Sequence, residues 1–199
     1  MPRPAAHTDP VLTRRETPAD VSAARAVIAA AFAKPGTAGS PGSPGSPGSQ
    51  GSQGSPDPVE ATLLDALRTC DGWLPELSFV AVDEKDEVAG HVVCTRGHVD
   101  GVPALGLGPI GVRPDVQRQG TGLALVHSVL GAADALGEPL VALLGSPAYY
   151  GRYGFRPATE LGILPPDPAW GDYFQVRTLT AYEPTLRGTF RYAEPFDHV

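Results

Sequence analysis

A glycine-rich turn between an apolar strand and a helix constrains this chain more than any other feature of its sequence. The turn lies within residues 108–124, where an apolar run ends near Val112 and a helical pattern begins at Gly120. Backbone amides at the start of a helix have no partner inside it, and the aligned peptide dipoles place about half a positive charge there. Gly120 and Gly122 also leave room for a close approach, and Arg118 adds charge. The segment therefore predicts a site for a phosphate or pyrophosphate group.

Two common phosphate-binding motifs do not account for this turn. A Walker loop needs Gly-Lys-Ser or Gly-Lys-Thr, and neither triplet occurs in the 199 residues. The dinucleotide pattern GxGxxG does occur, as Gly106-Leu-Gly108-Pro-Ile-Gly111. Its third glycine should lie in an opening helix, but Pro114 follows, and a proline inside a helix costs about 3 kcal/mol. A simple tight turn stays an alternative, because glycine also serves turns that bind nothing.

The spacing of apolar residues elsewhere predicts a mixed order of helices and strands. Helices are expected over residues 21–33, 59–69, 120–136 and 146–153, and strands over residues 79–82, 88–95, 105–112, 140–144 and 174–180. Thr17, Pro18 and Asp20 supply an N-cap, a first-turn proline and a first-turn acid to the first helix. The charged turn at residues 83–87 makes the first two strands a β-hairpin. The predicted fold class is α/β, in the mixed or α+β sense.

A glycine repeat interrupts the chain after the first helix. Glycine stands at every third position from Gly39 to Gly54, with Ser-Pro or Ser-Gln between the glycines. Such a segment buries little apolar surface, and six triplets are too few for the three-chain assembly of a collagen helix. We expect a disordered insertion over residues 36–57, inside a single domain that spans residues 11–199. An arm that binds a partner is the alternative.

Composition and charge narrow the class of protein. The chain carries a net charge of -7, which disfavours the general phosphate attraction of nucleic-acid binders. Cys70 and Cys94 lie far apart, without CxxC spacing or clustered histidines, so neither a disulfide framework nor a metal site is expected. No apolar run approaches the roughly 20 residues of a membrane span, and residues 1–10 lack the apolar core of a secretory signal. We expect a cytoplasmic protein without membrane or nucleic-acid partners.

Several motifs resemble the GNAT superfamily of N-acetyltransferases. Gln117-x-x-Gly120-x-Gly122 is similar to the coenzyme A signature of the superfamily, and residues 107–114 resemble its fourth strand. The run Ala148-Tyr-Tyr-Gly-Arg-Tyr-Gly-Phe-Arg-Pro157 resembles its later Tyr-x-x-x-Gly-Phe element. Further stretches at residues 75–77, 144–150 and 192–196 are similar to the bacterial YhbS-type subgroup. Apart from the glycine repeat, the resemblance covers nearly the whole chain.

The resemblance implies the GNAT acyl-CoA N-acyltransferase fold, with a central, mostly antiparallel twisted sheet flanked by helices. It implies transfer of the acetyl group of acetyl-CoA to a primary amine, with acetyl-CoA as co-substrate and without a metal. Backbone bonds to the pantetheine arm map to Ile110, Gly111 and Val112. The pyrophosphate maps to the amides of Gln117, Arg118, Gln119, Gly120, Thr121, Gly122 and Leu123. A GNAT-like sensor or scaffold that binds acyl-CoA without turnover is the alternative.

Acetyl transfer needs a neutral amine, a stabilised oxyanion and a proton for the departing thiolate. Tyr150 stands five residues before Phe155 and so matches the family tyrosine that protonates the coenzyme A sulfur. Simple packing of the tyrosine cluster on the sheet is the alternative. Glu76, ahead of the hairpin, is our hypothesis for the base, directly or through water; an ordinary surface carboxylate is its alternative. A backbone amide near Val112 is expected to meet the oxyanion.

The acceptor stays open between a small molecule, a peptide N-terminus and a protein lysine. Many superfamily members have an asparagine after the fifth strand, but this chain has Gly145-Ser-Pro147, so that marker is missing. The net acidity favours a cationic or amine-bearing acceptor without identifying it. No histidine pair has ligand spacing, and we expect Trp73 and Trp170 to pack rather than to line an acceptor pocket. A homodimer that pairs through the C-terminal strand is also open.

Overall fold

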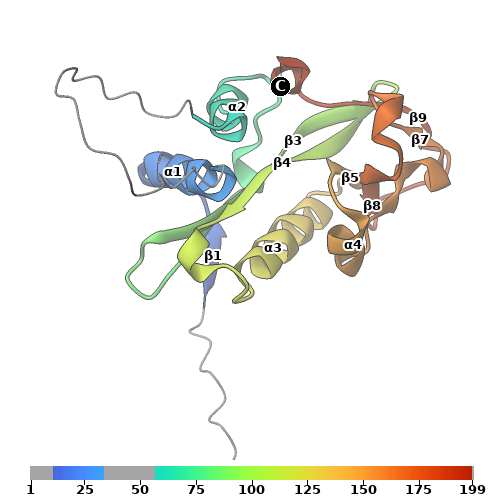
Figure 1. Cartoon of the computed structure of the whole chain (residues 1–199). Helices are drawn as coiled ribbons and strands as arrows, with labels where there is room; N and C mark the ends of the chain where they lie inside the picture. The colour runs from blue at the N-terminus through green and yellow to red at the C-terminus, as the bar shows by residue number, and fades with distance from the viewer. Residues whose placement is uncertain (1–10, 34–56, 199) are drawn as a thin grey trace, which may run out of the picture.

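The computed structural model describes residues 11–33 and 57–198, and it places a sheet between two layers of helices (Figure 1). The strands are β1 Leu12–Arg15, β2 Ser78–Val82, β3 Val88–Val99, β4 Val102–Val112, β5 Leu140–Leu144, β6 Arg156–Pro157, β7 Ile163–Leu164, β8 Phe174–Thr178 and β9 Gly188–Arg191. The α-helices are α1 Val21–Phe32, α2 Val59–Leu67, α3 Thr121–Ala135 and α4 Pro147–Tyr150. The expected insertion, apart from its last residue, lies outside the described residues.

The main sheet runs in the order β1-β2-β3-β4-β5-β8-β6, with β9 beside β3 and β7 beside β9. The β4–β5 and β7–β9 pairs are parallel, and the other pairs are antiparallel. The mixed fold class and the mostly antiparallel sheet are therefore confirmed. Strand β8, which the sequence left open for dimer pairing, has β5 and β6 of its own chain on its two sides.

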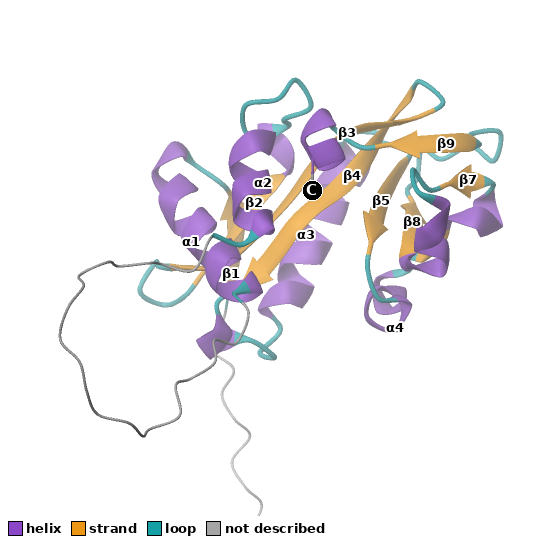
Figure 2. Cartoon of the chain, turned by 45° about the horizontal axis from the view of Figure 1, so that its top comes forward, coloured by secondary structure: helices purple, strands orange, loops and turns teal. Residues whose placement is uncertain are grey.

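Helices cover both faces of the long β3–β4 hairpin (Figures 1 and 2). On one face, Ile28 of α1 and Leu64 of α2 pack with Val93 in a buried cluster. On the other face, Leu125 of α3 packs in a second buried cluster with Val92. Successive side chains of a strand point to opposite faces, so β3 supplies neighbouring residues to two different cores. Each fully buried leucine or isoleucine contributes roughly 1.5–3 kcal/mol to the stability of this sandwich.

Every helix and strand expected from the sequence is present, although several ends differ. The second helix ends at Leu67 rather than Thr69, and the two strands of the central hairpin continue further than predicted, to a turn at Asp100 and Gly101. The predicted helix over residues 146–153 divides into α4 and one turn of 3-10 helix. The sequence pattern did not predict β1, β6, β7 or β9. All four strands are short, and β1 and β9 are also rich in polar residues.

A bulge interrupts the pairing of β4. Opposite the single residue Val93 of β3, β4 places two residues, Gly108 and Pro109. A bulge bends its strand, and proline has no N–H to donate to a neighbouring strand. β4 pairs with β5 only at Leu105 and Gly106, before the bulge, so the two strands separate beyond it. The glycine run at residues 106–111 thus lies inside a strand, which agrees with rejecting the dinucleotide interpretation.

A buried ion pair connects β1 to α2. The carboxylate of Glu16, just after β1, lies 2.5 Å from Nη2 of Arg68 and 3.1 Å from Nε2 of His91, and it accepts a hydrogen bond from the Ser78 hydroxyl. Burial by itself would raise the pKa of Glu16, but the hydrogen bonds with His91, Ser78 and Arg68 outweigh burial and lower this pKa to about 2. Burial lowers the pKa of His91, so its ring is neutral at pH 7.

We expect acid to destabilise the fold through this cluster. A carboxylate with a lowered pKa contributes stability that is present above its unfolded pKa, about 4.3, and is lost as the pH falls from about 5 to about 2. His91 adds an effect of the same sign, since the unfolded chain takes up a proton at this ring below a pH of about 6.5. Glu16→Gln should lower the free energy of unfolding at pH 7 by about 3 kcal/mol and flatten its dependence on pH.

Urea unfolding between a pH of about 2 and about 7 measures this effect. Glu84→Gln, at an exposed carboxylate in the turn between β2 and β3, is the control and should keep the wild-type pH dependence. A Glu16→Gln protein as acid-sensitive as the wild type would contradict the assignment.

Candidate active site

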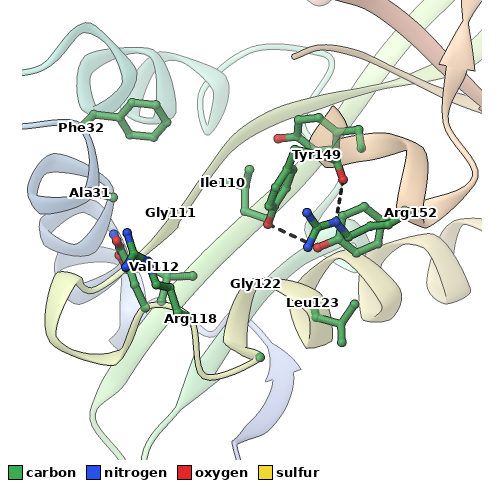
Figure 3. Close-up of a pocket in the computed structure, with 14 residues that line it drawn as sticks. Ala31, Phe32, Ile110, Gly111, Val112, Arg118, Gly122, Leu123, Tyr149 and Arg152 are labelled. Atoms are coloured by element: carbon green, nitrogen blue, oxygen red, sulfur yellow. Dashed lines mark hydrogen bonds between the residues drawn. The ribbon is translucent and has the colours of Figure 1, made fainter. Parts of the chain in front are cut away.

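A cavity of about 670 Å³ lies where β4 leaves β5 and α3 begins (Figure 3). This volume is within the range of about 300–1,000 Å³ that is common for small-molecule sites. The wall is built from the end of α1, the last part of β4, the turn before α3 and the tyrosine-rich segment after β5: Ala31, Phe32, Ile110, Gly111, Val112, Gln117, Arg118, Gly120, Gly122, Leu123, Tyr149, Tyr150, Arg152 and Tyr153. The two arginines are the charged members of this wall, so the cavity favours anions.

The backbone of β4 offers hydrogen-bonding groups to this cavity. The amide of Arg113 donates to a carbonyl of β3, and because antiparallel pairing alternates, the backbone groups of Gly111 also face β3. Those of Ile110 and Val112 therefore face the opposite edge of the strand. There the carbonyl of Val112 accepts a hydrogen bond of 3.0 Å from the side-chain amide of Gln117. The edge can bind an extended ligand in the way that a sheet binds an added strand.

The first turn of α3 offers amides to the same cavity. Gly120 is the N-cap, with a φ of 94° that favours glycine. The first bond of the helix runs from the amide of Ala124 to the carbonyl of Gly120, so the amides of Thr121, Gly122 and Leu123 have no partner within the helix. No side chain of the described ranges caps them. An anion at this end of α3 would meet both these donors and the positive end of the helix dipole.

The predicted cofactor-binding residues line this cavity, with the exception of Gln119 and Thr121. Those two line a separate cavity of about 170 Å³. Arg118, the residue before Gln119, has a positive φ of 64°. Thr121 is only 1% exposed, because its side chain packs in the core. Thr121 can therefore bind an anion through its backbone amide.

Three residues of the wall had no sequence signal that we recognised. Ala31 and Phe32 come from the end of α1, and Figure 3 shows them across the strand edge from Tyr149 and Arg152. Spacing along a sequence does not show which helix end reaches a distant turn. Arg152 lies inside the tyrosine motif and was the one member that charge could have pointed to.

Tyr150 packs in the core and lines the cavity at the same time. Its ring packs against Gly145, just after β5, where a Cβ atom would have no room. Gly145 is fixed from two sides: its amide donates to the carbonyl of Tyr173 at 2.9 Å, and its carbonyl accepts from the side-chain amide of Gln175 at 2.8 Å. Burial raises the pKa of Tyr150 to about 12, with a smaller contribution from Tyr149, so the phenol keeps a proton to donate at pH 7.

Glu76 lies apart from these residues. It is exposed in the 3-10 turn Pro75–Leu77 ahead of β2, and it does not belong to the cavity wall. None of the residues that line the cavity has a carboxylate or an imidazole. In the part of the chain that the structure describes, no three His, Cys, Asp or Glu side chains gather as metal ligands. Each helix of that same part is too short or too polar to cross a membrane.

The comparisons with known proteins agree with this geometry. Residues 13–158 match the family described as acetyltransferase (GNAT) domain. The uncharacterized N-acetyltransferase YhbS of Escherichia coli K12 is 32% identical over 141 residues, which cover 70% of this chain and 82% of YhbS.

Two similar solved structures carry coenzyme A or its acetyl thioester. Escherichia coli YhbS in complex with CoA matches with a TM-score of 0.75 and 26% identity, over 96% of each chain. A GNAT family acetyltransferase from Brucella melitensis in complex with acetyl-CoA matches with a TM-score of 0.67 and 26% identity, over 94% of this chain and 99% of that one. The resemblance to YhbS-type proteins is confirmed, and the chain belongs to the GNAT family of acetyltransferases.

Proposed function

We propose that this protein transfers the acetyl group of acetyl-CoA to a primary amine. The observation that carries the proposal is that a free strand edge, an uncapped helix N-terminus and a buried tyrosine line one cavity. An extended arm with an anion at one end and a thioester at the other could use all three features. The CoA and acetyl-CoA complexes of the two similar proteins support this choice of cofactor.

Each part of the cofactor has a proposed place. The pantetheine arm lies along β4, where Ile110 and Val112 present backbone groups to it. Gly111 lets α1 approach the strand, since a Cβ atom there would lie 2.9 Å from Ile28 and 3.0 Å from Ala31. The pyrophosphate lies on the backbone of residues 117–123, with the guanidinium groups at positions 118 and 152 nearby.

In the proposed reaction, one hydrogen-bond donor serves each of the two negative charges that develop, on the oxyanion and on the departing sulfur. The amine nitrogen attacks the thioester carbon, and a backbone N–H of β4 near Val112 stabilises the oxyanion that forms. The carbon–sulfur bond then breaks, and the Tyr150 hydroxyl gives its proton to the departing sulfur. Solvent returns a proton to the phenolate, whose high pKa makes that recovery favourable. The protein thus acts through positioning and through two hydrogen-bond donors.

The proton of the amine leaves through water in this proposal. The residues that line the cavity include no carboxylate or imidazole able to take it. Glu76 stays our proposed acceptor at the far end of such a path, because it is exposed to solvent ahead of β2. We also propose that residues 11–199 form one domain that acts in the cytoplasm without a metal, a nucleic acid or a membrane.

Titration calorimetry with acetyl-CoA tests the first half of the proposal, and a micromolar Kd is the expected result for the wild-type protein. A panel of small amines, peptides with free N-termini and lysine peptides then tests the second half, with thiol release as the readout. Binding without thiol release from any member would favour an acyl-CoA sensor. No binding by a folded protein would overturn the proposal.

A further inference from the structure

Tyr149 lines the cavity beside Tyr150, but the proposed chemistry gives it no task. Its hydroxyl lies over the first turn of α3: a Cβ atom built on Gly122 would be 3.3 Å from this oxygen and 3.7 Å from Cγ2 of Val112. Gly122 is the second residue of the helix, where the amides have no helical partner. The hydroxyl and these amides therefore face the same space.

The separation of these donors suits one shared acceptor. A Cβ atom lies about 2.5 Å from the amide nitrogen of its own residue, so the Tyr149 oxygen is no more than about 6 Å from the nitrogen of Gly122. This limit allows a single ligand oxygen to accept from both at ordinary lengths of about 2.8–2.9 Å. Phosphate oxygens at a helix N-terminus have this position.

Neighbouring side chains hold Tyr149 in the orientation that this contact needs. The hydroxyl of Tyr153 donates to the hydroxyl of Tyr149 at 3.3 Å, which leaves the proton of Tyr149 available for another acceptor. Burial raises the pKa of Tyr153, and the bond to Tyr149 adds to that shift, so this donor stays protonated. Arg152 donates from Nε to the carbonyl of Tyr149 at 2.9 Å, and its guanidinium carbon lies 4.7 Å from the centre of the Tyr149 ring (Figure 3).

We infer that the Tyr149 hydroxyl, supported by Tyr153, donates a hydrogen bond to the pyrophosphate of bound coenzyme A and sets the affinity for the cofactor. The inference rests on the proposed function, which supplies the cofactor. Tyr149 is 37% exposed and lines the cavity, so a ligand there can reach this residue. Two adjacent tyrosines thereby have separate tasks: Tyr150 serves the sulfur, and Tyr149 serves the phosphates.

Tyr149→Phe tests this division, because it removes one oxygen and keeps the ring. Calorimetry with CoA should give a Kd about tenfold above that of the wild type, as expected for a hydrogen bond to a charged group. ADP, which carries a pyrophosphate without pantetheine, should lose affinity by a similar factor when measured by ligand-observed NMR. Tyr182→Phe, at a tyrosine outside the cavity, is the matched control and should bind CoA like the wild type.

The role of Tyr153 has its own readout. Tyr153→Phe should raise the Kd for CoA about threefold in the wild type and leave it unchanged in Tyr149→Phe, since it acts through that hydroxyl. An unchanged Kd for CoA in Tyr149→Phe would overturn the inference, and so would a loss seen with CoA but not with ADP. A wild-type protein that binds no CoA would instead remove the proposed function, so the two failures are distinguishable.

Discussion

Gly122→Glu is expected to raise the Kd for CoA at least about 100-fold, which corresponds to about 2.7 kcal/mol. Its side chain would begin 3.3 Å from the Tyr149 hydroxyl and extend into the space that we assign to the pyrophosphate. Its carboxylate would also repel the phosphates, because at this short distance water screens the two charges only in part. Calorimetric titration with CoA measures the effect directly, without knowledge of the acceptor.

Gly131→Glu is the matched control for this variant. Gly131 lies in the same helix, is exposed, and a Cβ atom there would meet nothing within 4 Å. The two variants carry the same added charge, and both replace a helical glycine, which favours the helix by about 0.5–1 kcal/mol. Only Gly122→Glu should lose affinity, while the Kd of Gly131→Glu stays within about twofold of the wild type. Tight binding by Gly122→Glu would place the pyrophosphate elsewhere.

Tyr150→Phe should lower kcat about 100-fold or more, because positioned general acids typically contribute about 10²–10⁴-fold. The remaining ring still packs against Gly145, so the fold and the Kd for acetyl-CoA should change little. Thiol release at saturating cofactor, with the best acceptor from the amine panel, gives the measurement. Since the pKa of Tyr150 is raised to about 12, deprotonation of this phenol should not limit the wild-type rate below a pH of about 10.

Comparison with Tyr149→Phe distinguishes a general acid from a group that only binds the cofactor. We expect it to raise the KM for acetyl-CoA and to keep kcat, whereas Tyr150→Phe should do the reverse. A Tyr150→Phe enzyme with the wild-type kcat would mean that the thiolate leaves without this proton. It would leave the cofactor site itself untouched.

The features that the sequence predicted well have causes within a few residues of one another. Thr17 and Asp20 form the capping box that begins the first helical segment, and both partners lie in one turn. The glycine turn before α3 was found in the same way. In each case a local backbone requirement selects the residue type, so the residue type reveals the conformation.

The features that the sequence did not predict depend on distant partners. Glu16 lies 75 positions from His91, and nothing in the polar run around β1 shows that a carboxylate there will be buried. Phe32 and Arg152 line one cavity because the end of α1 and the 3-10 turn after α4 both lie near the same edge of β4. Hydrophobic periodicity assigns faces within an element, and it carries no information on which faces of different elements meet.

The bulge at Gly108 and Pro109 bears on how an inhibitor of this protein should be built. Because β4 and β5 pair only before this bulge, the edge of β4 beyond it is already open, and a ligand need not separate the two strands. A flexible arm such as pantetheine loses conformational entropy when it is straightened along β4, at about 0.5–1.5 kcal/mol for each flexible group that is fixed. A rigid, extended mimic with an anionic group at one end would avoid that loss. It should therefore have a larger binding free energy per non-hydrogen atom than the natural cofactor.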